Sequence, residues 1–174
     1  MKPVVPYTIQ SGMSQSGSYI LMLLEPTSER QIPIIIGAHD AQGILLAKET
    51  VRTRRPMTHE LMVRMMEDYG LRLIMVTIDR VLDGVFYATL HISDGFNEKA
   101  IDSRTTDAIT LALLTDAPIM VDDNVLEETG VAADEQPSPT PTLEALEAEL
   151  RRCEEAEDYE QAAEIQKRIE EMKS

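Results

Sequence analysis

Residues 71–101 read LRLIMVTIDRVLDGVFYATLHISDGFNEKAI. Strand-like runs alternate here with turn signals, and the runs lie at 71–82, 84–93 and 98–101. The separating pairs Asp83-Gly84 and Asp94-Gly95 are typical of tight turns between neighbouring strands. We therefore expect consecutive strands joined by short turns in this part of the chain.

Strands and helices are also expected on both sides of this stretch. The further strands are expected at 19–25, 32–37 and 118–121, and the helices at 40–51, 58–69 and 102–114. Thr58 is expected to cap the second helix, and its buried stripe would comprise Leu61, Met62, Met65 and Met66. Strands interleaved with helices indicate the α+β class, with a mostly antiparallel or mixed sheet covered by helices.

The composition excludes several classes of protein. The 174 residues include 31 acidic and 16 basic side chains, and the formal charge of −15 argues against coating nucleic acid through bulk charge. The one cysteine excludes an internal disulfide framework or a cysteine-rich zinc site. No apolar run approaches the roughly 18–20 residues of a membrane span, and the first residues do not resemble a secretory signal. We therefore expect a cytoplasmic protein without a membrane anchor.

Charge and proline content divide the chain. Residues 1–125 carry 16 acidic and 11 basic side chains, a net charge of −5, whereas residues 126–174 carry 15 and 5, a net charge of −10. Three prolines between residues 137 and 141 predict an extended linker. The sequence thus predicts a domain at 1–131, a linker at 132–142 and a helical hairpin at 143–174.

The expected hairpin carries two apolar stripes with the same 3, 4, 3 spacing. They are formed by Leu143, Leu146, Leu150 and Cys153, and by Ala162, Ile165, Ile169 and Met172. Because such short helices are marginal alone in water, we expect the stripes to dock onto a protein partner. The alternative is a solvated helical extension.

A cluster of polar residues precedes the helix expected at 58–69. Arg52, Arg54 and Arg55 stand out in so acidic a chain, and guanidinium groups match the geometry of phosphate oxygens. His59, beside the helix start, is of a residue type that transfers protons near neutral pH. The alternative is an ordinary loop whose arginines pair with acidic neighbours.

Two carboxylates, Asp102 and Asp107, bracket the start of the helix expected at 102–114. Together they could hold Mg²⁺ or Mn²⁺, which would activate a water molecule against a phosphodiester. The alternative is a helix-capping role, because a first-turn Asp complements the helix dipole. A weaker candidate for site residues is the stretch Gly37-Ala38-His39-Asp40-Ala41. It lies at the junction of an expected strand and the helix that follows it, which is a common place for such residues.

Residues 5–128 resemble the bifunctional nuclease family through four motifs that occur in the family's order. The motifs are Pro33-Ile34-Ile35-Ile36-Gly37, Arg55-Pro56-Met57-Thr58-His59-Glu60-Leu61, the stretch 101–113 and Pro118-Ile119. This resemblance implies a compact α+β fold that self-associates, with nuclease activity on DNA and RNA. The chain departs from the family pattern at Asp40 (usually Glu), Glu60 (usually Asp), Thr105-Thr106 (usually Pro-Ser) and Leu114 (often Arg).

The same resemblance implies a set of site residues. It assigns catalytic roles to His59, Glu60, Asp102 and Asp107 and substrate binding to Arg55, Thr58 and Arg104. Asp40 also belongs to the characteristic polar set. A Mg²⁺ or Mn²⁺ ion would be held by Asp102 and Asp107.

The tail resembles the UVR motif, the helical hairpin of the nucleotide-excision-repair proteins B and C. The matching residues are 143–147 and 157–169, with the specific Asp-Tyr-Glu-x-Ala-Ala-Glu core at 158–164. The resemblances together imply a nuclease acting on DNA or RNA as a homo-oligomer, with a dimer favoured, whose hairpin docks a protein partner. The alternative is a non-catalytic oligomeric adaptor that recruits a repair or proteolysis component through the hairpin.

Overall fold

The computed structural model describes residues 1–11, 17–50 and 54–132. The strands in these residues are β1 (Lys2–Ser11), β2 (Ser18–Leu24), β3 (Gln31–Gly37), β4 (Arg72–Leu82), β5 (Val85–Ser93), β6 (Glu98–Arg104) and β7 (Ile119–Val121). The helices are α1 (Ala38–Lys48), α2 (Thr58–Asp68), α3 (Thr105–Thr115) and α4 (Asp123–Thr129). The hairpin expected at 143–174 and linker residues 133–142 lie outside the described residues.

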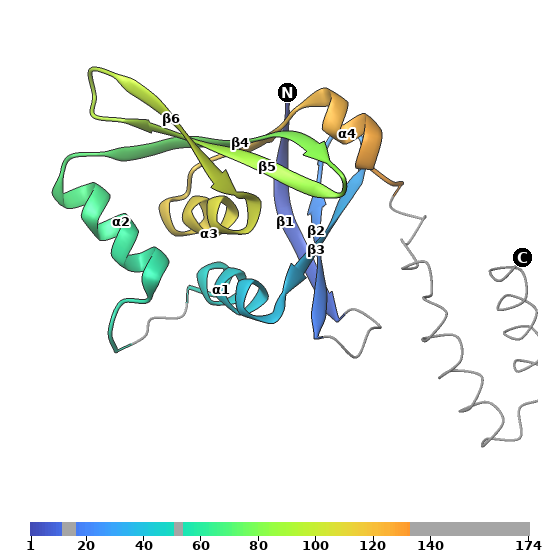
Figure 1. The fold of residues 1–174 in the computed structure, drawn as a ribbon, viewed down its shortest axis with the longest axis horizontal. Helices are drawn as coiled ribbons and strands as arrows, with labels where there is room; N and C mark the ends of the chain where they lie inside the picture. The colour runs from blue at the N-terminus through green and yellow to red at the C-terminus, as the bar shows by residue number, and fades with distance from the viewer. Residues whose placement is uncertain (12–16, 51–53, 133–174) are drawn as a thin grey trace, which may run out of the picture.

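All of these strands belong to one sheet, in the order β3-β2-β1-β7-β4-β5-β6 (Figure 1). Neighbouring strands are antiparallel, except β4 and β7, which are parallel. This mixed sheet, with helices packed on it, confirms the expected α+β class. None of the helices in the described ranges is long and apolar enough to cross a membrane.

The strands expected at 71–82, 84–93 and 98–101 correspond to β4, β5 and β6. Asp83 and Gly84 both have positive φ angles, 50° and 75°, as a type I′ hairpin turn requires. β6 runs farther than expected, because its pairing with β5 continues as far as Arg104 opposite Tyr87. The helix expected to begin at residue 102 therefore begins at Thr105.

The sequence pattern does not predict strand β1 or helix α4. β1 contains Pro3 and Pro6, which have no N–H group to donate to a neighbouring strand and which normally argue against a central strand. The sheet accommodates them because each proline has a neighbouring strand on one side only: Pro3 lies outside the pairing with β2, which begins at Val5, and Pro6 lies outside the pairing with β7, which ends at Val4.

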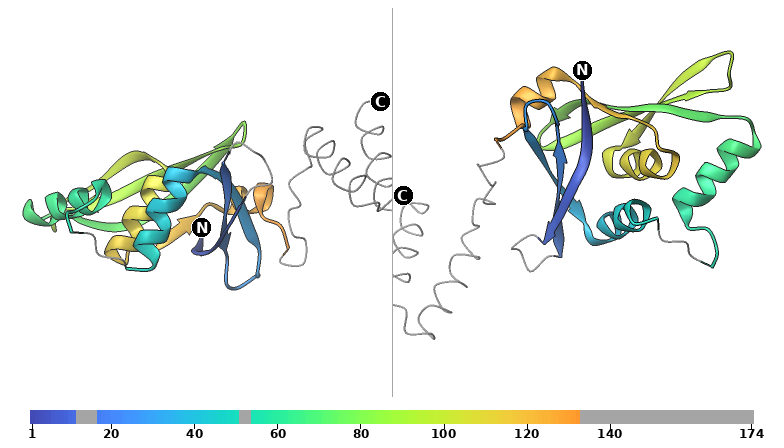
Figure 2. Two further views of the ribbon diagram at one scale, coloured as in Figure 1. Left: turned by 90° about the horizontal axis from the view of Figure 1, so that it is seen from below. Right: turned by 180° about the vertical axis from the view of Figure 1, so that it is seen from behind.

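Helices α1 and α3 pack against each other, and α3 lies on strands β4, β5 and β6. Ala108, Ile109 and Leu111 of α3 are completely buried, so this helix occupies the centre of the core. α2 extends beyond the sheet at one end of the domain, and α4 lies at the other end (Figure 2). Because α3 packs against both α1 and α2, the first residues of these three helices can form a common site.

The apolar stripe expected on α2 is mostly exposed: the prediction is wrong for Leu61, Met62 and Met65, and only Met66 is partly buried. Leu61, Met62 and Met65 are 41–54% exposed, whereas Val63 and Met66 pack partly buried against the core. The helix is amphipathic, but it packs on α3 through a neighbouring face. The exposed side chains form an apolar surface on α2.

The turn between β2 and β3 is organised by a buried carboxylate. Glu25 is fully buried, and its side chain accepts hydrogen bonds from the Ser28 hydroxyl, from Thr27 N–H (2.9 Å) and from Ser28 N–H (2.7 Å). The hydrogen bond from the Ser28 hydroxyl, followed by that from Thr27 N–H, lowers the pKa of Glu25 from 4.5 to about 2. The ionised carboxylate therefore stabilises the folded state.

We predict that Glu25→Gln lowers the free energy of unfolding at neutral pH. Because the folded pKa is the lower one, the wild type keeps this stabilisation above about pH 4.5 and loses it as the pH falls toward about 2. The difference between variant and wild type should therefore shrink across that interval. Urea unfolding at a series of pH values measures it, with Glu29→Gln, an exposed carboxylate of the same turn, as the control. A difference that stays constant with pH would contradict the role of the ionised form.

The end of α4 is joined to the start of β3. The backbone groups of Gln31 and Val131 exchange two hydrogen bonds of 2.8 Å, and the Arg30 guanidinium donates to the Gly130 carbonyl at 2.7 Å. These contacts anchor the last described residues to the β2–β3 turn.

Candidate active site

The first turns of three helices, α1, α2 and α3, border a single pocket of about 80 Å³, which is room for a few water molecules. From these turns the pocket is lined by His39, Asp40, Thr58, His59, Glu60 and Thr106. The amino end of a helix carries a partial positive charge and N–H groups without intrahelical partners. These helix ends favour an anion at their side of the pocket, whereas the rest of the lining includes the apolar side chains of Leu46, Ala47 and Leu114.

The first residues of α1 and α3 receive no side-chain cap from the residue that precedes each helix. The preceding residues are Gly37, which has no side chain, and Arg104, whose guanidinium has no acceptor, so neither can cap its helix. At α2 the situation differs, because the Glu60 carboxylate accepts a hydrogen bond of 2.8 Å from Met57 N–H. Thr58, expected to cap α2, is instead its first residue, and Met57 takes the cap position.

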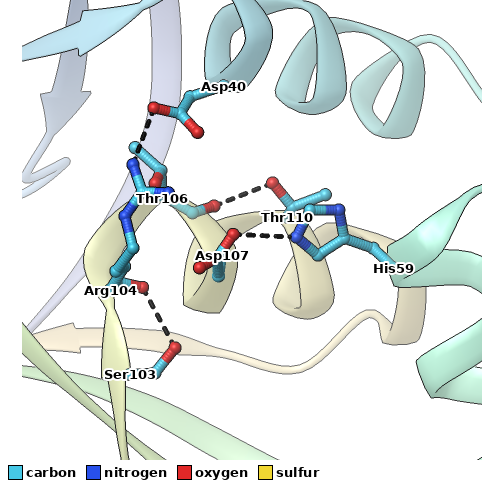
Figure 3. Close-up of polar contacts among 7 residues, drawn as sticks. All are labelled: Asp40, His59, Ser103, Arg104, Thr106, Asp107 and Thr110. Carbon is cyan, nitrogen blue, oxygen red and sulfur yellow. Dashed lines mark hydrogen bonds and ion pairs between the residues drawn. The ribbon is translucent and has the colours of Figure 1, made fainter.

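His59 and Asp107, 48 residues apart in the chain, meet across α2 and α3 (Figure 3). The distance from His59 Nε2 to Asp107 Oδ1 is 3.0 Å, and the side chains are 24% and 35% exposed. Because an ionised carboxylate only accepts hydrogen bonds, this contact places a proton on Nε2. The neutral ring then keeps its lone pair on Nδ1, which can accept a proton from a water molecule.

A second ionic contact joins the start of α3 to α1. Arg104 Nη2 lies 2.9 Å from Asp40 Oδ2 (Figure 3). The Arg104 side chain is 66% exposed and that of Asp40 is 16% exposed. Because most of the Arg104 side chain is in solvent, its guanidinium is accessible to a second anion, whereas the Asp40 carboxylate is largely buried.

Thr106 carries a buried hydroxyl without a hydrogen-bond partner among the described residues. The other threonines of α3 all bond to carbonyl groups: Thr105 to that of Phe86, Thr110 to that of Thr106 and Thr115 to that of Leu111, at 2.8–2.9 Å. A helical threonine commonly bonds to the carbonyl four residues earlier, but residue 102 lies in β6 and not in the helix. An unsatisfied buried hydroxyl of this kind costs about 1–3 kcal/mol.

The structure does not bring Asp102 together with Asp107. Asp102 lies opposite Thr89, between neighbours on β5, Ala88 and Leu90, that are buried in the core that includes α3. Because side chains alternate between the two faces of a sheet, Asp102 belongs to the face away from α3. In the described ranges, no group of three or more His, Cys, Asp or Glu residues is placed to hold a metal ion. The expected Mg²⁺ or Mn²⁺ pair of ligands therefore does not fit, and we derive no step through a metal.

Comparison with known proteins identifies the family of this domain. A model of the bifunctional nuclease domain matches residues 21–134. The chain belongs to the bifunctional nuclease domain family. It is 30% identical over 136 residues to the uncharacterized protein Rv1829 of Mycobacterium tuberculosis, covering 78% of this chain and 81% of that protein.

More distant relatives of this bifunctional nuclease domain occur in rice. Bifunctional nuclease 1 of Oryza sativa subsp. indica is 24% identical over 137 residues, which cover 77% of this chain and 40% of the rice protein. Bifunctional nuclease of Oryza minuta is 26% identical over 124 residues, which cover 70% of this chain and 37% of that protein. The chain thus spans about two fifths of the length of these plant proteins.

The expected site residues of the bifunctional nuclease domain occupy different positions relative to the pocket. Thr58, His59 and Glu60 line it, and Asp107 joins it through its hydrogen bond to His59. Arg104 reaches it through Asp40, which lines the pocket. Arg55 is exposed on the segment that leads into α2. The Glu60 carboxylate holds the start of α2 through Met57 N–H.

Sequence reasoning did not identify Thr106 as a site residue of the bifunctional nuclease domain. Its unsatisfied hydroxyl results from the extension of β6 to Arg104, which removes the helical carbonyl that would otherwise accept its hydrogen bond. The only signal in the sequence is the substitution of Thr106 for the Ser usual in the family, which keeps a hydroxyl at the start of the helix. His39 and Asp40 also line the pocket, at the strand-to-helix junction that gave a weak signal.

Proposed function

We propose that this bifunctional nuclease domain hydrolyses phosphodiester bonds of DNA, RNA or both at the pocket between α1, α2 and α3. The observation that carries the proposal is the His59–Asp107 hydrogen bond beside a pocket that helix amino ends border. A phosphodiester is an anion, and its hydrolysis needs a base that accepts a proton from water. In this domain, helix amino ends that favour an anion and a histidine that can accept a proton lie beside the same pocket.

In the proposed reaction, Nδ1 of His59 accepts a proton from a water molecule while the water oxygen forms a bond to phosphorus. The bond from phosphorus to the leaving sugar oxygen breaks, and solvent protonates that oxygen. Asp107 holds the imidazole orientation and stabilises the imidazolium that forms. Arg104 and the N–H groups at the start of α3 would stabilise the charge on the phosphoryl oxygens.

The acidic composition is compatible with this function. Two thirds of the net charge belongs to residues 126–174, and binding of a phosphate depends on the local field of helix ends and guanidinium groups. Arg55 and Thr58 would hold the nucleic-acid strand beside the start of α2. We assign to Glu60 the positioning of that helix start, because its carboxylate is engaged by Met57 N–H.

The remaining features of the proposed function concern partners and location. We propose that residues 143–174 dock a protein partner through their two apolar stripes, and that the protein acts in the cytoplasm. The exposed apolar surface on α2 favours a homodimer.

The test is a cleavage assay of the full chain on single-stranded DNA and RNA, with Mg²⁺, Mn²⁺ or EDTA in parallel reactions. We expect cleavage of at least one polymer. Asp102→Asn should cleave at the wild-type rate, because Asp102 belongs to the sheet face away from the pocket. A purified full chain that cleaves neither polymer under any of these conditions would contradict the proposal.

A further inference from the structure

We infer that the Thr106 hydroxyl and the first N–H groups of α3 form a subsite for a tetrahedral phosphate group, which Arg104 shares when it leaves Asp40. The inference rests on the proposed function for its role in hydrolysis. The observations behind it are a buried donor that is unsatisfied among the described residues, an uncapped helix start and an exposed guanidinium.

The Thr106 hydroxyl is the most direct sign of a missing ligand. The residue is 8% exposed and lines the pocket, yet its hydroxyl has no partner in the described part of the chain. Thr110 and Thr115 of the same helix satisfy theirs with backbone carbonyls. A phosphate oxygen would accept the hydrogen bond that the protein does not supply.

The donor groups at this position favour an anion, and the two carboxylates that line the pocket are engaged, Asp40 by Arg104 and Glu60 by Met57 N–H. α3 has 11 residues, and its amino end receives no acceptor from the side chain of Arg104. The carboxylate of its first turn, Asp107, is hydrogen-bonded to His59. N–H groups at a helix start, a hydroxyl donor and a guanidinium are the groups that bind phosphate in proteins.

Asp40 and a phosphate would compete for the same guanidinium. The Asp40 carboxylate lines the pocket and binds Arg104 at 2.9 Å. Release of Arg104 would leave the Asp40 carboxylate, which is only 16% exposed, without its cation, so a charged Asp40 lowers the affinity of the subsite for phosphate. Removing the charge of Asp40 should therefore strengthen phosphate binding, whereas removing the Thr106 hydroxyl should weaken it.

The phosphate can come from two sources, an internal diester of a strand or a terminal monoester. Titration calorimetry of the full chain with inorganic phosphate, with the dinucleoside monophosphate of thymidine and with thymidine monophosphate separates them. The dinucleoside has only an internal diester, and thymidine monophosphate has only a terminal monoester. Preferential binding of one probe assigns the source.

The decisive comparison is between the wild type and variants that remove or keep the Thr106 hydroxyl. Thr106→Val should lower the affinity for inorganic phosphate about tenfold, because a hydrogen bond to a charged group is lost. Thr106→Ser should bind like the wild type. Thr115→Val, the same change on the same helix at a hydroxyl already bonded to Leu111, should leave the affinity unchanged. Asp40→Asn should raise the affinity for phosphate several-fold. If Thr106→Val does not fold, Thr106→Ala, which also lacks the hydroxyl, takes its place, and an affinity equal to that of the wild type overturns the subsite.

Two results would overturn the subsite: no binding of phosphate by the wild type, or equal affinities of folded Thr106→Val and wild type. The outcome is distinguishable from failure of the proposed function. Phosphate binding that depends on Thr106 in a protein without cleavage activity would support the subsite and reject the nuclease proposal. Cleavage at an unchanged rate by Thr106→Val, with unchanged phosphate affinity, would reject the subsite alone.

Discussion

His59→Ala is expected to reduce the rate of nucleic-acid cleavage by about a hundredfold to ten-thousandfold, the usual contribution of a general base. The fold should persist, because α2 has no fully buried residue and the His59 side chain is partly exposed. Initial rates with the purified full chain measure the effect, and circular dichroism checks the fold. Added imidazole should restore part of the rate, since it supplies the lost base. A merely structural role of His59 would not respond to imidazole.

Asp107→Asn should also lower the rate, by a smaller factor, because the amide can still accept the hydrogen bond from Nε2 but no longer stabilises the imidazolium. The double variant should be little slower than His59→Ala, since the two residues act as a unit. His91→Ala is the matched control, because His91 bonds to Thr77 at 3.1 Å and does not line the pocket. Activity that survives in both His59→Ala and Asp107→Asn would place the chemistry elsewhere.

Gly130→Ala is expected to lower the free energy of unfolding by about 1–3 kcal/mol, the range typical of overpacking. A Cβ atom at this position would overlap the carbonyl oxygen of Leu126 and lie 3.1 Å from Nε of Arg30. The carbonyl belongs to α4 and accepts the N–H of Gly130 itself, so it cannot turn away without breaking that bond. The clash should also loosen the two hydrogen bonds between Val131 and Gln31.

Urea unfolding of the full chain measures the effect of Gly130→Ala. Gly43→Ala provides a control of opposite sign, because Gly43 lies inside α1 with no atom within 4 Å of the added Cβ. Alanine in a helix interior should stabilise the protein by about 0.5–1 kcal/mol relative to glycine. Equal unfolding midpoints for Gly130→Ala and the wild type would show that α4 adjusts without cost.

Much of the fold follows from short-range patterns in the chain. The turn signals Asp83-Gly84 and Asp94-Gly95 lie between strands that pair with their neighbours in sequence. Predictions that depended on which face a helix buries were less successful. Leu61 and Met65 were expected inside but are exposed, because apolar spacing identifies a helix and not the element it packs against.

The candidate site likewise combines features that the local sequence specifies with features that only the packing of the helices decides. The residue types and helix starts at His59, Arg104 and Asp107 are properties of local sequence, and they suffice to propose phosphate chemistry. The partnership of His59 with Asp107, and of Arg104 with Asp40, depends on how α1, α2 and α3 pack. Asp102 and Asp107 are five positions apart, yet the pairing of β6 with β5 separates them, because strand alternation directs Asp102 away from the core. Packing also leaves the Thr106 hydroxyl without a partner among the residues that the structure describes, since satisfaction of a buried group depends on neighbours that no local pattern specifies.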